Sequence, residues 1–302
     1  MEEQKGLSLI GLIVTIFIIL FIIAVIMPLL HPGKKIAQRV VCGTNLKGLG
    51  TAMVVYANDY DDAYAQLPGA GPWSKRLGFD YDYAKPDFDE GGAEEKTSRT
   101  ITASLYLLVR EADVSPKSFI CPENYYRKWY ERSKPKNYIE FTGENAKGLD
   151  LVELWDFGPN PHNHVSYAYH NPYGKFPANG ECSAAFAMMA DMNPWFKKGD
   201  IIKSGPQNQP PQLLTISDSI TREQYKNSNA YHHGYEGQNV LFGDGHSSFE
   251  KQPNVGVNND NIYTYWSIEE NPTEQDRQGG TAPTGRGPEN DAKSSDDSFL
   301  VL

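Results

Sequence analysis

The stretch that decides the architecture is LSLIGLIVTIFIILFIIAVIMPLL, which runs from Leu7 to Leu30 and contains no charged residue. As an α-helix it would be about 36 Å long, slightly more than the roughly 30 Å hydrocarbon core of a bilayer. A cleaved secretory signal has a shorter apolar core that ends in small residues. Here the run passes through Pro28 into His31 and Pro32 instead. We therefore expect residues 7–30 to be a retained, single-pass transmembrane helix.

The rest of the chain is polar and acidic. The sequence has 302 residues, with 28 lysines and arginines against 38 aspartates and glutamates, a net charge of −10. Phosphate backbones are bound by clustered basic side chains, and the sequence has no such cluster, so we expect no nucleic acid partner. The 27 glycines, 20 prolines and 18 tyrosines favour turns and short strands over a helical bundle.

Residues 31–62 carry the pattern of an amphipathic helix. The apolar residues that recur at three- and four-residue steps are Leu46, Leu49, Met53, Tyr56, Ala57 and Tyr60. His31-Pro32-Gly33 precedes this stripe, so we expect a kink or short break there. The pattern predicts that the distal half of the N-terminal helix packs on its own domain.

The order of features near the N-terminus has a recognisable form. Gly6 is followed by Leu7-Ser8-Leu9-Ile10, then by the apolar run, and then by AQRVVCGTNLKGLG at residues 37–50 and YAND at residues 56–59. This order resembles the N-terminus of type IV pilins and type II secretion pseudopilins. More narrowly, it is similar to the large pilin-like proteins of the planctomycete type.

The resemblance implies processing, location and partners. A prepilin peptidase would remove the leader, residues 1–6, by cutting after Gly6, and Leu7 would become the methylated N-terminus. The helix would then sit in the inner membrane until it packs against other pilin-like subunits or copies of itself. One departure is Gly11, because the family usually has a glutamate at that position, thought to set the register of subunits.

The flanking charges favour the orientation opposite to the one the resemblance implies. Lys5 stands before the apolar run with Glu2 and Glu3, whereas the basic residues after it are Lys34, Lys35, Arg39 and Lys47. The positive-inside rule would place the C-terminal part in the cytoplasm, although long domains translocate largely regardless of charge. The resemblance places the same part in the periplasm or outside the cell.

Residues 63–270 are expected to form an extracytoplasmic α+β head domain. A helix is predicted over 100–112, and strands over 165–169, 184–189, 212–217 and 238–243. Asp244-Gly245 predicts a hairpin that returns through Phe249. Residues 271–302 read as a flexible tail or a long loop, whose apolar end could dock as an edge strand. The expected fold class is α+β: a long N-terminal transmembrane helix packed on an antiparallel β-sheet head, as in pilins.

Three of the apolar runs end in an aspartate, namely Asp191, Asp218 and Asp244. If these runs are neighbouring strands, the carboxylates could converge near His232, His233 and His246. Imidazole groups suit Zn²⁺ and carboxylates suit Ca²⁺, so the pattern is compatible with a divalent cation site. The alternative is that each aspartate caps a turn through its own backbone.

The C-terminal half and the cysteines add two expectations. His233 and Asp244-Gly245 resemble the His-to-Asp-Gly signature that closes the planctomycete-type proteins, with ten intervening residues where nine are usual. An exported domain permits disulfides, and we expect Cys42 to pair with Cys121, which leaves Cys182 either free or in an intermolecular bond.

The resemblance implies a structural function, that of a pseudopilin-like subunit in a type II secretion or type IV pilus-like apparatus. The sequence has no HExxH, GxSxG, Walker or dinucleotide-binding motif, so we expect no catalytic residue and no enzymatic activity. The alternative is a membrane-tethered extracytoplasmic ligand-binding protein or metal-dependent enzyme that keeps the leader only for export.

Overall fold

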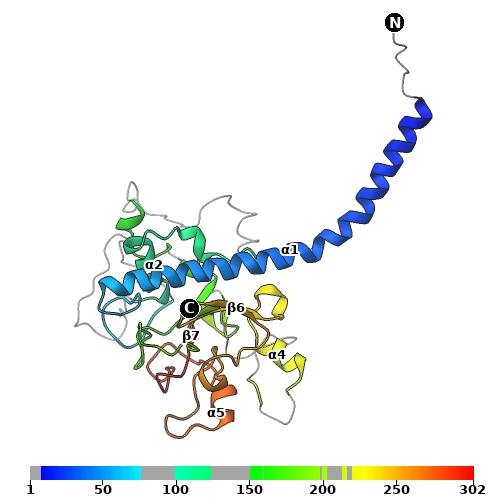
Figure 1. The fold of residues 1–302 in the computed structure, drawn as a ribbon. Helices are drawn as coiled ribbons and strands as arrows, with labels where there is room; N and C mark the ends of the chain where they lie inside the picture. The colour runs from blue at the N-terminus through cyan, green and yellow to red at the C-terminus, as the bar shows by residue number, and fades with distance from the viewer. Residues whose placement is uncertain are drawn as a thin grey trace.

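The computed structural model describes residues 8–75, 99–123, 150–158, 160–197, 199–202, 213–215 and 220–302, with the backbone alone for residues 27–32. The fold is α+β. A long N-terminal helix runs across the head and extends well beyond it, and a five-stranded antiparallel sheet lies under its second half (Figure 1).

Helix α1, Leu9–Asp59, is a single helix of 51 residues. The break expected at His31-Pro32-Gly33 does not occur, and the helix bends between its outer half and the half on the head (Figure 1). A proline removes one backbone hydrogen bond and pushes on the preceding turn, which bends a helix without ending it when the flanking turns are intact.

The second half of α1 buries one stripe of side chains. Cys42, Leu46, Leu49 and Met53 are fully buried at alternating four- and three-residue steps. The helix contacts strands β5 (Gln238–Phe242) and β6 (Ser247–Glu250). The stripe was predicted up to Tyr60, but that ring is 43% exposed. This spacing keeps the buried side chains on one helix face, toward the sheet.

The main sheet has the strand order β6-β5-β2-β1-β7, and every neighbouring pair is antiparallel. Its strands are β1 Tyr167–His170, β2 Ala187–Asp191, β5 Gln238–Phe242, β6 Ser247–Glu250 and β7 Leu300–Val301. A separate two-stranded ribbon consists of β3 Phe196–Lys197 and β4 Asp200–Ile201. The strands predicted around residues 165–169, 184–189 and 238–243 correspond to β1, β2 and β5. Of the run predicted at 212–217, residues 213–215 are described, and they are not in a strand.

Short helices complete the head. Among the described residues, the α-helices are α2 Ile101–Glu111, α4 Arg222–Ser228 and α5 Glu274–Gln278, and the 3₁₀ turns are η1 Pro116–Phe119, η3 Leu151–Glu153, η4 Pro161–Asn163, η5 His232–Tyr235 and η6 Val257–Asn259. Helix α2 begins at Thr100, whose hydroxyl accepts a 2.9 Å hydrogen bond from the Ala103 amide. This cap satisfies one of the free amides of the first turn.

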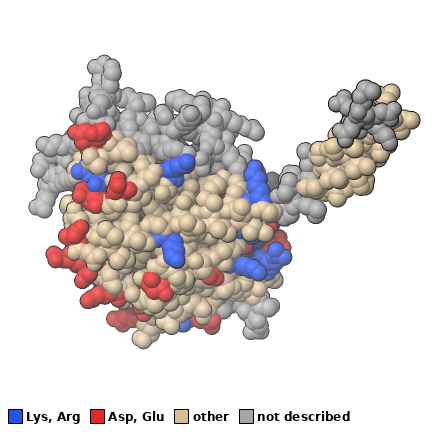
Figure 2. All heavy atoms as spheres, turned by 45° about the horizontal axis from the view of Figure 1, so that its top comes forward, with Lys and Arg blue, Asp and Glu red and all other residues tan. Residues whose placement is uncertain are grey.

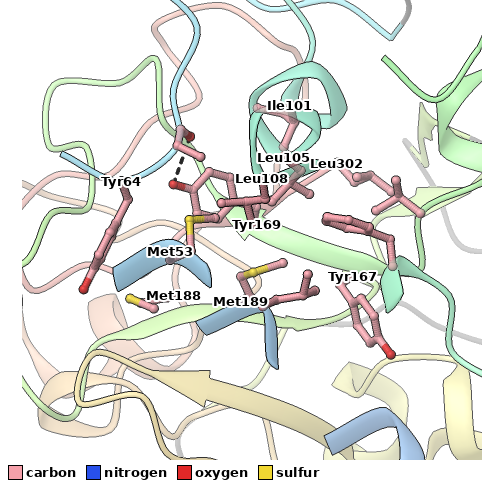
Figure 3. Packing of buried hydrophobic residues seen from close by; sticks show 14 of the residues in the cluster. Met53, Tyr64, Ile101, Leu105, Leu108, Tyr167, Tyr169, Met188, Met189 and Leu302 are labelled. Atoms are coloured by element: carbon pink, nitrogen blue, oxygen red, sulfur yellow. Dashed lines mark hydrogen bonds between the residues drawn. The ribbon is translucent and has the colours of Figure 1, made fainter. Parts of the chain in front are cut away.

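The hydrophobic core lies between the helices and the sheet (Figure 3). Met53 comes from α1, Leu105 and Leu108 come from α2, and Tyr169 and Met189 come from β1 and β2. The Tyr169 hydroxyl donates a 3.2 Å hydrogen bond to the carbonyl of residue 65, so the polar end of a buried ring is satisfied.

Residues 271–302 are folded onto the head, so the prediction of a flexible tail is wrong. The Asp297 carboxylate accepts hydrogen bonds from the backbone amides of Trp266 (2.9 Å) and Lys293 (2.7 Å). The polar side chains that suggested a solvated tail therefore bind backbone groups instead. Strand β7 pairs with β1 at the edge of the sheet, as expected for the apolar end, and the side chains of 299–302 are buried.

Candidate functional site

The outer half of α1 is an exposed apolar surface. Residues Leu9–Ile26 have a mean hydropathy of 3.5, and none of this segment is buried within the chain. Figure 2 shows this rod standing clear of the head, with no charged side chain among its described atoms. By length and composition the segment could cross a membrane. The expected processing residues, Gly6 and Leu7, lie outside the described part of the chain.

Gly11 is a position on the apolar surface of α1 that has no side chain. A Cβ atom placed there would meet nothing within 4 Å, and the Thr15 hydroxyl donates a 2.7 Å hydrogen bond to the Gly11 carbonyl. The threonine therefore presents little polar character to its surroundings. Small residues on an apolar helix let a second helix approach closely.

A second feature lies inside the head, at the end of β2. Asp191 is fully buried, and its Oδ2 accepts hydrogen bonds from the backbone amide (2.7 Å) and the side-chain amide (3.2 Å) of Asn239. His233 places its Nε2 3.3 Å from the same oxygen. His232 Nδ1 lies 3.5 Å from Asp191 Oδ1, which is long for a hydrogen bond.

The backbone of the η5 turn aims the His233 ring inward. His233 has φ +55° and ψ +24°, a left-handed conformation that is uncommon for a residue with a side chain. Its Nδ1 pairs with the Glu123 carboxylate, and the Phe249 ring stands edge-on to the imidazole at 5.8 Å. The ring is thus held on one side by Glu123 and faces Asp191 with the other.

The expected disulfide joins Cys42 of α1 to Cys121, just after η1, with 5.2 Å between the Cα atoms. It lies against the histidine, because Cys121 Sγ is 3.7 Å from His233 Nε2. Cys182 is unpaired and partly buried. The disulfide, the histidine and the aspartate therefore form one contiguous buried cluster.

The electrostatics of the cluster follow from burial and mutual contact. Burial alone would raise the pKa of Asp191, but its contacts with the His233 and His232 rings hold it well below its usual range. Burial opposes protonation of His233 as well, yet Asp191 and Glu123 raise the pKa of its imidazole. Burial lowers the pKa of His232. The contacts with Asp191 and Glu123 thus favour the protonated form of His233, whereas burial favours the neutral form of His232.

The aspartates predicted to converge do not meet. Strands β2 and β5 are antiparallel, so Asp191 at the end of β2 lies beside the start of β5, whereas Asp244 follows the end of β5. Asp244 is exposed in the hairpin turn, where its Oδ1 accepts a 3.0 Å hydrogen bond from the His246 amide. This is the turn-capping arrangement that was the alternative to a metal site. Asp218 lies outside the described residues.

Two members of the cluster were not among the predicted site residues. Asn239 lies on β5 directly beside Asp191, and Glu123 follows Cys121 by two positions. Both could have been found by combining two separate expectations. Pairing β2 with β5 in antiparallel register brings Asn239 to Asp191, and the Cys42–Cys121 bond carries Glu123 to the same place.

Neither a protein-family model, nor a curated protein, nor a solved structure matches this chain. Three structural features of the chain bear on its function. They are the exposed apolar half of α1, the attachment of the other half to the sheet, and the buried cluster at the disulfide.

Proposed function

We propose that this chain is a membrane-anchored, pilin-like structural subunit, with the outer half of α1 in the inner membrane and the head in the periplasm or outside the cell. The observation that most supports this is that the two halves of one continuous helix of 51 residues have different surroundings. Its first half is apolar and uncovered, and its second half is buried on the sheet of the head.

The exposed half of α1 needs an apolar environment. Removing apolar surface from water contributes roughly 25 cal/mol per Å². All of the large side chains from Leu9 to Ile26 are at least 43% exposed, so both a bilayer and a bundle of identical helices would stabilise the segment. In a bilayer the gain from helix association comes from close packing, and Gly11 provides the small contact surface for it.

The disulfide supports a head outside the cytosol. Cys42–Cys121 links α1 to the η1 region across a sequence separation of 79 residues. Disulfides of this structural kind form and persist in the periplasm and at the cell surface and are rare in the cytosol. This argument opposes the orientation favoured by the flanking charges, and long domains are the known exception to that charge rule.

The tethered ligand-binding or enzymatic alternative has less support. Its best candidate residues, Asp191 and His233, have fully buried side chains and already bind each other. A substrate would need a path to them, and two cavities of the described part of the chain are lined by other residues. A structural subunit needs no such path.

Native membranes provide the test. Intact-mass and N-terminal analysis should find the chain beginning at Leu7, methylated, and shearing of cells should release it in polymers. A bulky substitution on the apolar half, Gly11→Ile, should reduce the polymeric fraction and leave the protein in the membrane, whereas Ile10→Leu should change neither. An unprocessed chain found only as membrane monomers would contradict the proposal.

A further inference from the structure

Four buried side chains from four different elements gather their ligand atoms at the disulfide. Cys42, Cys121, Asp191 and His233 place two sulfurs, a carboxylate oxygen and an imidazole nitrogen within 4.8 Å of one another. The donors come from α1, the segment just after η1, the end of β2 and η5. Two thiolates, one imidazole and one carboxylate make a set that favours Zn²⁺.

The distances between these atoms fit a tetrahedral ion. With metal–sulfur bonds of about 2.3 Å and metal–nitrogen or metal–oxygen bonds of about 2.0–2.1 Å, neighbouring ligand atoms should be about 3.3–3.8 Å apart. His233 Nε2 is 3.3 Å from Asp191 Oδ2 and 3.7 Å from Cys121 Sγ. All four ligand atoms lie within 4.8 Å of one another, and the two sulfurs, which are bonded to each other, must move apart.

We propose that reduction of the Cys42–Cys121 disulfide converts this cluster into a Zn²⁺ site with Cys42, Cys121, His233 and Asp191 as ligands. A dithiol reductant supplies two electrons and two protons, the S–S bond breaks, and the reductant leaves as its own disulfide. Zn²⁺ then displaces the two thiol protons to solvent, and any proton on His233 Nε2 leaves as well.

The surroundings orient the ligands as a metal site requires. Pairing of His233 Nδ1 with Glu123 leaves Nε2 to face Cys121 Sγ and the Asp191 carboxylate, and the Asn239 side-chain amide, 3.2 Å from Nε2, would turn away when a metal binds. A carboxylate behind a ligating histidine is the usual arrangement at zinc sites and raises the basicity of the ring. Asn239 holds one oxygen of Asp191, and among the described residues the other oxygen accepts no hydrogen bond although it is buried.

As a consequence, α1 can be linked to the head at Cys42 in two alternative ways. In an oxidising compartment the disulfide holds Cys42 of α1 to the head, and under reducing conditions Zn²⁺ would hold the same residue through three elements of the head. The metal would thus maintain the arrangement of α1 on the sheet before oxidation occurs.

Metal binding by the full-length protein in detergent micelles tests this. A Cys182→Ser chain, which removes the unpaired thiol, is reduced with dithiothreitol, desalted without oxygen, and titrated with Co²⁺ and then Zn²⁺. The reduced chain should bind one Co²⁺, with sulfur-to-cobalt charge-transfer absorption and the intense visible bands of tetrahedral cobalt, and Zn²⁺ should displace it. The oxidised chain should bind none.

Variants separate the site from the fold. His233→Asn keeps a residue that tolerates positive φ and should abolish the cobalt spectrum, and Glu123→Gln should weaken binding about 10- to 100-fold. His246→Ala, at the exposed hairpin, should bind as the parent does. Zn²⁺ should also raise the Tm of the reduced parent. Reduced protein that holds no metal, or a His233→Asn chain with the parent's cobalt spectrum, would overturn the proposal.

Discussion

Removal of the Cys42–Cys121 disulfide should cost the head a large part of its stability. The bond closes a loop across a sequence separation of 79 residues. In the chain-entropy model, a cross-link of this span lowers the entropy of the unfolded chain by an amount worth about 4.5 kcal/mol at 25 °C. Both sulfurs are fully buried in the core, so replacing both cysteines by alanine also loses some packing.

The assay is urea unfolding of the full-length protein in micelles, followed by tryptophan fluorescence, with a chelator present to exclude metal. The Cys42→Ala, Cys121→Ala double variant should lose about 3–5 kcal/mol of the free energy of unfolding relative to the oxidised parent. Cys182→Ser should change it by less than about 0.5 kcal/mol, as for other sites outside the core. A loss below about 1 kcal/mol in the double variant would refute the reasoning that the disulfide fastens α1 to the head.

Three further substitutions test the packing and the buried charges. Phe299→Ala should cost about 3–5 kcal/mol in urea unfolding because the ring is 1% exposed, whereas Ile268→Ala, at 43% exposed, should cost little; equal effects would contradict a folded C-terminal segment. Gly237→Ala should cost at least about 2 kcal/mol, since φ is +150° and the new Cβ would lie 2.2 Å from the Glu250 carbonyl oxygen; a chain as stable as the parent would rule out this turn. Burial raises the pKa of Asp156 from 3.8 to about 7, so the folded chain keeps a proton that the unfolded chain releases, and stability should fall as the pH rises between these values. The loss of unfolding free energy between about pH 4 and pH 8, measured by urea unfolding, should be smaller in Asp156→Asn than in the parent by up to roughly 4 kcal/mol. The same pH dependence in both chains would show that the carboxyl titrates normally.

The helix and the main strands could be predicted because their signals are local. An uncharged apolar run, a stripe from Leu46 to Met53, an alternating segment around Tyr167 and a compact apolar segment around Val240 each report on their own stretch of chain. The Asp244-Gly245 hairpin was visible for the same reason, although only Gly245 of the pair has positive φ. A kink or short break was expected at His31-Pro32-Gly33, and the helix bends without breaking (Figure 1). The packing of the following turns, which keeps the helix intact, is not a local property of the sequence.

The buried cluster and the C-terminal segment depend on contacts between distant parts of the chain. Asp191 and Asp244 look equivalent in the sequence, and the antiparallel pairing of β2 with β5 sends them to opposite ends. The polarity of residues 271–298 suggested disorder because the sequence does not reveal that Asp297 binds the backbone of Trp266. Strand order and register are the information that local patterns lack.

The most direct test of a membrane-anchored chain with an extracytoplasmic head is the sidedness of an exposed residue. Asp244 is exposed in the hairpin turn, so an Asp244→Cys substitution in a Cys182→Ser chain supplies a single reporter thiol beside the intact disulfide. A membrane-impermeant maleimide should label it in right-side-out inner-membrane vesicles, and in inside-out vesicles only after detergent is added. Labelling in intact inside-out vesicles alone, or recovery of the chain in the soluble fraction, would contradict the account.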